Sequence, residues 1–211
     1  YVTPQRRALA ISCSKSTVNA YKLTEKQDVS LYIGIPFCPT RCSYCSFVSR
    51  TVGKNMSFLD PYLEALLTEL SYTGKLLSDS GHTIRTIYIG GGTPTSLNEM
   101  QLERLLQKVE DLFHPDENME YTVEAGRPDT ITREKLRLMK EYRVNRISIN
   151  PQTMNDKTLL GVGRKHTVED IRRVFWEARE EGHENINMDL ILGLPGENAE
   201  DVRNTMEEIM K

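Results

Sequence analysis

Three cysteines, Cys38, Cys42 and Cys45, lie within eight residues of one another. Thiolates are the ligands of soft metal centres such as iron–sulfur clusters. Three protein ligands leave one iron of a four-iron cube open to a small molecule. Zinc is the alternative, but a structural zinc site has four ligands, and neither Cys13 nor His166 has finger-like spacing. A ferredoxin module would supply four cysteines. The spacing therefore predicts a cluster with one open coordination position.

Other segments with ligand-binding residue types follow apolar runs of strand type. They are residues 90–95, 124–129, 150–152 and 193–196, while Asp189 lies within the last apolar run. Taken singly, a glycine run is a tight turn, and Glu124, Gln152 and Asp189 are helix caps or a solvated rim. No Lys-Ser/Thr pair follows the glycines, so they do not form a P-loop. Beside a cluster, the glycine backbone and these side chains suit the amino, carboxylate and ribose groups of a small ligand.

The elements that must position these residues alternate between strands and helices. Apolar β-prone runs predict strands at 31–35, 84–89, 121–124, 146–149 and 186–192. Helical spacing predicts helices that start at Asp60-Pro61, at a capping box of Ser96 and Glu99, at 132, at a second capping box of Thr167 and Asp170, and at 200, with Gly182 as a helix stop. Five such repeats imply an α/β fold with a parallel sheet, either open or closed into a barrel. Ligands of both bind at the carboxyl ends of the strands, where these segments lie.

Composition limits the class of protein. The chain has 211 residues, 38% hydrophobic and 27% charged, and its net charge of −3 gives no reason to expect a nucleic-acid partner. It has no apolar run near the ~20 residues that span a bilayer and no secretory signal. Clustered cysteines then favour a reducing compartment, and we expect a cytoplasmic protein. The chain starts at Tyr1 and stops within a helical pattern, so we expect an excised piece, with 1–29 as a linker or upstream remnant and 30–211 as the core domain.

The remaining aromatic, basic and histidine residues carry weaker signals. Arg164 and Lys165 follow a glycine-rich loop at 161–163 and could be a solvated charge pair. Four aromatic residues flank the cysteine loop and would shield it from water: Tyr32, Phe37, Tyr44 and Phe47. Three histidines are expected at the surface: His82, His114 and His183.

On these residues the chain resembles the radical S-adenosylmethionine (SAM) superfamily. The signature is the CxxxCxxC spacing followed by an aromatic residue, and the GGGTPT run resembles the motif that binds the amino group of SAM. Four longer strings resemble the family of oxygen-independent coproporphyrinogen III oxidases: LYIGIPFCPTRCSYC, IYIGGGTPTSL, YTVEAGRPDTI and NMDLILGLPGE. The VEAGRPD and GIPFCPTRC variants are most similar to its HemZ-type coproporphyrinogen dehydrogenase branch. The resemblance covers about residues 30–211.

The resemblance implies a partial (β/α)6 TIM-like barrel, truncated here after the fifth repeat. It implies that Cys38, Cys42 and Cys45 bind a [4Fe–4S] cluster whose open iron binds SAM. Matching motifs give the expected SAM contacts: Tyr32, Tyr44, Gly91, Gly92, Thr93, Glu124, Gln152, Arg164 and Asp189. Two SAM molecules are expected in this family, and the contacts divide between them.

The implied reaction is oxidative decarboxylation of two propionates of coproporphyrinogen III to vinyl groups, which yields protoporphyrinogen IX in anaerobic haem biosynthesis. A reducing partner such as flavodoxin or ferredoxin would supply electrons. Gly34 and Phe47 stand where established oxidases carry His and Cys, and Phe47 also resembles the haem-chaperone branch. A haem chaperone and a haem-modifying radical SAM enzyme therefore stay open as alternatives. Positive charge for the propionates could come from Arg41, Arg50, Lys54 and Arg127.

Overall fold

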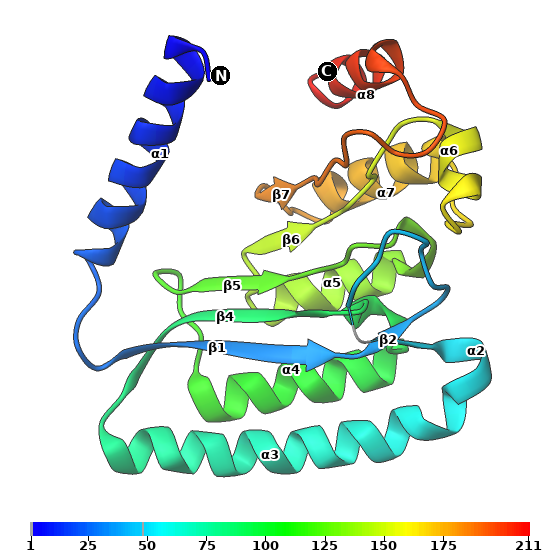
Figure 1. The fold of residues 1–211 in the computed structure, drawn as a ribbon. Helices are drawn as coiled ribbons and strands as arrows, with labels where there is room; N and C mark the ends of the chain where they lie inside the picture. Colours follow the sequence, from blue (N-terminus) through cyan, green and yellow to red (C-terminus); the bar gives the residue numbers. More distant parts are fainter. Residues whose placement is uncertain (1, 48) are drawn as a thin grey trace.

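A five-stranded parallel sheet forms the centre of the molecule (Figure 1). The computed structural model describes residues 2–47 and 49–211, without the side chains of 54–56. The strands lie side by side in chain order: β1 (Asp28–Ile35), β4 (Thr83–Gly91), β5 (Glu120–Val123), β6 (Arg146–Ser148) and β7 (Ile186–Asn187). Every pairing between them is parallel. The predicted α/β class and parallel sheet are confirmed.

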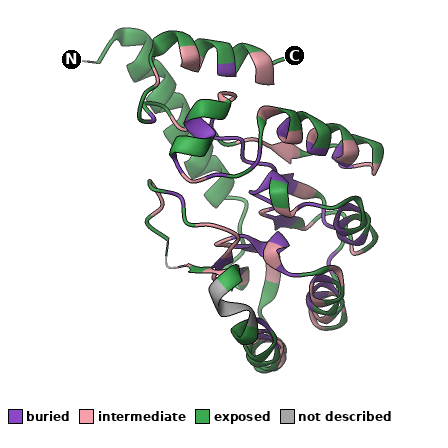
Figure 2. Ribbon diagram, turned by 90° about the vertical axis from the view of Figure 1, so that its right-hand side faces the viewer, coloured by how far each residue is buried: buried purple, intermediate pink, exposed green. Residues whose placement is uncertain are grey.

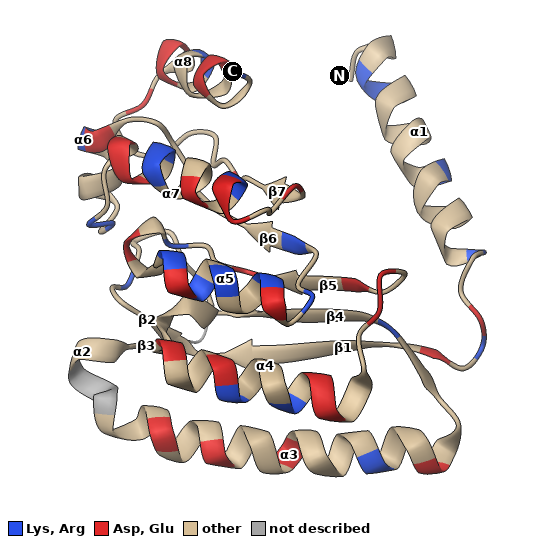
Figure 3. Cartoon of the chain, turned by 180° about the vertical axis from the view of Figure 1, so that it is seen from behind, with Lys and Arg blue, Asp and Glu red and all other residues tan. Residues whose placement is uncertain are grey.

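Four helices pack on one face of this sheet and form the core with it (Figure 2). They are α3 (Leu59–Ser80), α4 (Glu99–Phe113), α5 (Arg133–Glu141) and α7 (Val168–Glu180). Side chains alternate along a strand, so every second residue meets these helices, as Ile33, Ile35, Ile87 and Ile89 do. Removal of this apolar surface from water stabilises the fold. Charged residues of both signs occur along these helices, and acidic residues predominate on α3 (Figure 3).

The opposite face of β1, β4 and β5 carries polar and aromatic residues. Tyr32 of β1 and Tyr88 of β4 are neighbours in the parallel register, and Thr122 of β5 continues the row. The two tyrosine rings stack with centroids 5.8 Å apart. One face of the sheet thus forms the hydrophobic core. The other face carries polar and aromatic side chains, as the ends of the strands do.

Two predicted helix starts are wrong in detail. The capping box of α4 is formed by Asn98 and Gln101, and Ser96 lies in a short 3₁₀ helix (Pro94–Ser96) where its Oγ donates to the Phe37 carbonyl oxygen at 3.3 Å. For α3 the N-cap is Phe58, without a side-chain capping bond, and Asp60 lies in the first turn. The capping box predicted at the start of α7 is confirmed.

The fifth strand is shorter than predicted, and Asp189 lies beyond it. β7 ends at Asn187, after which the chain contacts the end of the fourth repeat through an isolated bridge between Gln152 and Leu190. The backbone at Gln152 has φ of 68°, a left-handed conformation that a regular ladder does not contain. Regular pairing of the two strands ends at Ser148 and Asn187 and resumes at Gln152, whose amide donates to the Asp189 carbonyl oxygen and whose carbonyl oxygen accepts from the Ile191 amide, both at 3.0 Å. Two further helices of the C-terminal part are α6 (Asp156–Gly161) and α8 (Ala199–Ile209).

The N-terminal segment forms a helix that the sequence pattern does not predict. α1 (Pro4–Tyr21) starts at an N-cap, Thr3, whose hydroxyl accepts from the Arg6 amide. It buries none of its residues and stands apart from the sheet in Figures 1 and 3. Its apolar residues do not gather on one face, so it has no stripe with which to pack. The boundary at residue 30 stays a prediction. Across the described residues, the structure contains no helix with the length and apolar character needed to cross a membrane.

Candidate functional site

One cavity at the carboxyl ends of the strands gathers the predicted residues. It has a volume of about 170 Å³ and draws its walls from segments that are far apart in the sequence. Its lining includes every predicted site residue except Tyr32: Cys38, Cys42, Tyr44, Cys45, Phe47, Gly91, Gly92, Thr93, Glu124, Gly126, Arg127, Asn150, Gln152, Arg164 and Asp189. The expectation that these segments meet at one edge of the sheet is confirmed for the cysteine loop, for residues 90–95, 124–129 and 150–152 and for Asp189, whereas residues 193–196 do not line the cavity.

The cysteine loop presents three thiols to this cavity. Cys38 ends the short strand β2 (Phe37–Cys38), which pairs with β3 (Arg50–Thr51) just before α2 (Val52–Asn55). Cys42 is 9% exposed and Cys45 half-buried, and the Cys45 amide donates to the Cys42 carbonyl oxygen at 3.1 Å. Within the described residues, His, Cys, Asp and Glu side chains do not gather in threes around a single-ion position. In a four-iron cube each thiolate would bind a different iron.

A second loop, between α6 and α7, is hydrogen-bonded to the cysteine loop. The Thr40 hydroxyl donates to the Gly163 carbonyl oxygen at 2.7 Å, and the Ser43 amide donates to the Val162 carbonyl oxygen at 3.0 Å. Gly163 has φ of 85°, and a Cβ there would lie 2.9 Å from the Arg41 carbonyl oxygen. Within the glycine-rich sequence at 161–163, Gly163 therefore permits close backbone contact with the cysteine loop.

The glycine run at the end of β4 also permits close backbone contact, here with the segment that leads into the cysteine loop. The Gly92 amide donates to the Ile35 carbonyl oxygen at 2.8 Å, and a Cβ on Gly92 would lie 2.6 Å from the Phe37 carbonyl oxygen. The Thr93 hydroxyl lies 3.3 Å from the Cys38 sulfur. The run thus brings the end of β4 against the cysteine loop, and it also leaves backbone exposed to the cavity.

Two carboxylates line the cavity beyond the thiols. Burial raises the pKa of Glu124, an effect that the Gly91 amide partly offsets and the nearby Asp189 charge reinforces. The Tyr88 hydroxyl donates to Glu124 at 3.4 Å, and Asn187 donates to Asp189 at 2.8 Å. Two carboxylates in one half-buried cavity can hold a cationic amine and accept from hydroxyl groups.

Arg164 is buried and shapes the cavity wall. It donates from Nε to the Tyr44 hydroxyl at 3.0 Å and from a terminal nitrogen to the Asn150 carbonyl oxygen at 2.6 Å. Burial raises the pKa of Tyr44 to about 12, so this hydroxyl is protonated at neutral pH. Arg164 is therefore a fixed part of the site, and the solvated charge pair considered for it is wrong.

A model of the radical SAM superfamily matches residues 32–209. The chain belongs to this superfamily. Radical SAM proteins use a [4Fe–4S] cluster and SAM, and the donor set described above fits both groups: three unpaired thiols for the cluster, and carboxylates with exposed glycine backbone for SAM.

Several known proteins are similar to this chain over most of its length. The chain is 44% identical over 187 residues to the oxygen-independent coproporphyrinogen-III oxidase-like protein HemZ of Bacillus subtilis. This alignment covers 88% of the chain and 37% of HemZ. The chain is 42% identical over 170 residues to the heme chaperone HemW of the same species, covering 80% of this chain and 43% of HemW. Coproporphyrinogen III oxidase (HemN) from Escherichia coli has a similar structure, with a TM-score of 0.77 and 31% identity over 85% of this chain and 41% of HemN. The chain thus spans about two fifths of these relatives, and the HemN fold agrees with the predicted partial barrel.

The structure places some predicted residues of this radical SAM domain elsewhere. Tyr32, an expected SAM contact, lies outside the cavity lining with 58% of its surface exposed, stacked on Tyr88. His183 is buried, with Nε2 at 2.9 Å from the Leu136 carbonyl oxygen, so its predicted surface position is wrong. Burial by the helices α5 and α7, which no local pattern reveals, is the reason.

Arg127 also differs from its predicted role. It was considered as positive charge for propionates, but it is 3% exposed and already bonded to Asp129. The side chain of Lys54, another candidate, lies outside the described residues. Sequence reasoning gave no role to Asp129, which bonds Arg127, and considered His166, which contacts Asp129, only as a zinc ligand. The one available signal was the position of Asp129 in the segment 124–129, directly after a strand.

Proposed function

We propose that Cys38, Cys42 and Cys45 bind the cluster and that the chain forms the SAM-cleaving core of a coproporphyrinogen III oxidase. The observation that carries this proposal is the convergence of three thiols and two carboxylates in one cavity. When bound and reduced, the cluster supplies the electron that cleaves SAM and starts the oxidative decarboxylation of a propionate to a vinyl group. Similarity to HemZ and HemN supports this substrate class.

The residues of the chain hold and orient the bound groups in this proposal. Glu124 and Asp189 accept from the ammonium and ribose hydroxyls of SAM, and the backbone at Gly91 and Gly92 faces its amino acid part. The remaining proposed contacts with SAM come from other residues of the cavity lining: Thr93, Gln152, Arg164 and Tyr44. A reducing protein such as a flavodoxin or ferredoxin would deliver the electrons.

Single replacements of the cysteines test the ligand assignment. After anaerobic reconstitution the wild-type protein should contain about four irons per chain. Cys38→Ala, Cys42→Ala and Cys45→Ala should each abolish cluster assembly or SAM cleavage. Cys13→Ala is the matched control, because Cys13 lies exposed on α1 and should leave both unchanged. Loss of the cluster in the control alone would refute the assignment.

A haem chaperone is the second candidate, and Phe47 favours it. Its side chain is 60% exposed at the cavity, where established oxidases carry a further cysteine, and HemW shares 42% identity with the chain. Anaerobic incubation of the full-length reduced protein with SAM and coproporphyrinogen III distinguishes the two. Vinyl-bearing product supports the oxidase, whereas tight haem binding without turnover supports the chaperone.

A further inference from the structure

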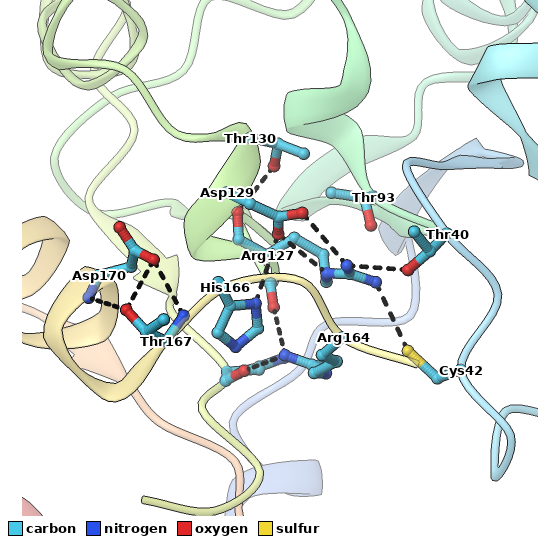
Figure 4. Close-up of polar contacts among 12 residues, drawn as sticks. Thr40, Cys42, Thr93, Arg127, Asp129, Thr130, Arg164, His166, Thr167 and Asp170 are labelled. Carbon is cyan, nitrogen blue, oxygen red and sulfur yellow. Dashed lines mark hydrogen bonds and ion pairs between the residues drawn. The ribbon is translucent and has the colours of Figure 1, made fainter. Parts of the chain in front are cut away.

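A buried guanidinium lies directly behind one of the proposed cluster ligands (Figure 4). Arg127 comes from the loop after β5, 85 residues from Cys42 in the sequence. Its NH1 group donates to the Cys42 sulfur at 3.5 Å, and its NH2 group donates to the Thr40 hydroxyl at 3.0 Å. Both partners belong to the cysteine loop, so one side chain contacts the ligand and the loop that carries it.

Asp129 and His166 hold this guanidinium in place. Asp129 accepts from Nε of Arg127 at 3.1 Å and from NH2 at 3.2 Å, a two-point contact that fixes the plane of the guanidinium. The fully buried His166 side chain lies with Nδ1 3.4 Å from Asp129. Although burial opposes it, the contacts with His166 and Arg127 hold the pKa of Asp129 well below its usual range. The carboxylate is therefore ionised, and the ion pair is complete.

These contacts leave Arg127 poorly suited to bind a substrate. Each of its three nitrogens has a partner within the chain, and only 3% of the residue is exposed. A propionate would have to compete with Asp129, whose two oxygens accept from Nε and NH2 of the guanidinium. The guanidinium therefore acts on the group beside it, which is the Cys42 sulfur.

A cluster held by three thiolates puts negative charge into this half-buried cavity, and reduction adds an electron. Hydrogen bonds to ligand sulfurs and nearby positive charge favour the reduced form and raise the reduction potential. The Thr93 hydroxyl lies near Cys38, but Arg127 adds a full charge near Cys42.

We propose that Arg127 is a positioning residue for the iron–sulfur cluster, which orients Cys42 and stabilises the reduced state, with Asp129 and His166 as its support. The inference rests on the proposed ligand set. It assigns a cluster-tuning role to the segment 127–129, which follows directly after the SAM-facing Glu124. One loop would then adjust the cluster and bind its co-substrate.

Arg127→Met tests the proposal in the full-length protein after anaerobic reconstitution. Methionine keeps the approximate length of the side chain and removes the charge and all donors. Arg133→Met is the matched control, since Arg133 is an exposed arginine of α5 that pairs with Glu180 and Glu181. Two readouts are independent of turnover: the rate at which a chelator removes iron, and the midpoint potential of the cluster from an electron paramagnetic resonance redox titration without SAM.

We expect Arg127→Met to lose iron about ten- to a hundredfold faster than the wild type. Its midpoint potential should shift to more negative values, while Arg133→Met should match the wild type in both readouts. Arg127→Lys keeps the positive charge but loses the two-point contact with Asp129. Asp129→Asn keeps the guanidinium but weakens the contact that fixes its position. Both should give smaller shifts of the same sign, and they decide the outcome if circular dichroism shows that Arg127→Met does not fold.

Wild-type iron retention and potential in Arg127→Met, or in both Arg127→Lys and Asp129→Asn, would overturn the proposal. An equal effect in Arg133→Met would also overturn it, because the change would then reflect general destabilisation. The ligand set itself is tested separately, since a wild-type protein without a cluster, or Cys42→Ala with a normal one, would refute the proposed function and with it this role.

Discussion

Replacement of Gly92 by alanine should separate the end of β4 from the cysteine loop. The added Cβ would lie 2.6 Å from the Phe37 carbonyl oxygen, 2.9 Å from the Phe37 amide nitrogen and 3.0 Å from the Ile35 carbonyl oxygen. All three are backbone atoms of β1 and β2 and cannot rotate away as a side chain would. The strand end or the loop must therefore move.

Overpacking of this kind costs about 1–3 kcal/mol of unfolding free energy. For a domain of 150–250 residues, 1 kcal/mol shifts Tm by about 2–4 °C, so we expect Gly92→Ala to lower Tm by about 2–12 °C. Thr93, the next residue, lies 3.3 Å from the Cys38 sulfur, so movement here should also reduce the iron bound after reconstitution. Differential scanning calorimetry and iron analysis measure the two effects.

Gly161→Ala is the matched control for this experiment. Gly161 is exposed at the last position of α6, and a Cβ there would meet no atom within 4 Å. The same chemical change should leave iron uptake unchanged and stabilise by about 0.4–1 kcal/mol, because alanine restricts the unfolded chain. A Tm for Gly92→Ala equal to that of the wild type, or an equal decrease in Gly161→Ala, would refute the reasoning.

Two further predictions concern buried charges. Burial raises the pKa of Glu124 in the folded protein above its ordinary value of 4.5. The ionised carboxylate therefore lowers the free energy of unfolding at neutral pH, and this cost disappears when the pH falls below 4.5, where the carboxyl is protonated in both the folded and the unfolded chain. Glu124→Gln should therefore raise Tm at neutral pH, and this increase should become smaller as the pH is lowered. Titration calorimetry should show about ten- to a hundredfold weaker SAM binding. A lower Tm at neutral pH, or wild-type SAM affinity, would contradict this. Lys135, buried in α5, donates to the Thr95 and Thr130 carbonyl oxygens at 2.8 and 3.0 Å, so Lys135→Met should cost about 1–3 kcal/mol in denaturant unfolding. The exposed Lys140 of the same helix, which donates to one carbonyl oxygen, is its control, and an equal loss in Lys140→Met would show that Lys135 has no special role.

Local spacing in the sequence was sufficient for the main features of this protein. The strand–helix alternation predicted a parallel sheet, and the order of strands then placed the cysteine loop, the glycine run and Glu124 at one edge. The helical spacing also predicted helices such as α4, whose leucines at that spacing are buried. These features depend on residues close together in the chain or on a general rule of sheet geometry, so one sequence contains enough information to predict them.

Contacts between distant segments were decided only by the tertiary structure. Arg127 looked like an available charge in the sequence, and its burial against Cys42 depends on how two loops 85 residues apart pack. The early end of β7 depends on its pairing with the preceding repeat, which is regular only as far as Ser148 and Asn187 and resumes at the bridge between Gln152 and Leu190. His183 is buried because two helices close over it. Arginine and histidine side chains are stable in water, and they are stable in the interior only when they have hydrogen-bonding or charged partners. Their location therefore depends on which partners the tertiary structure places beside them.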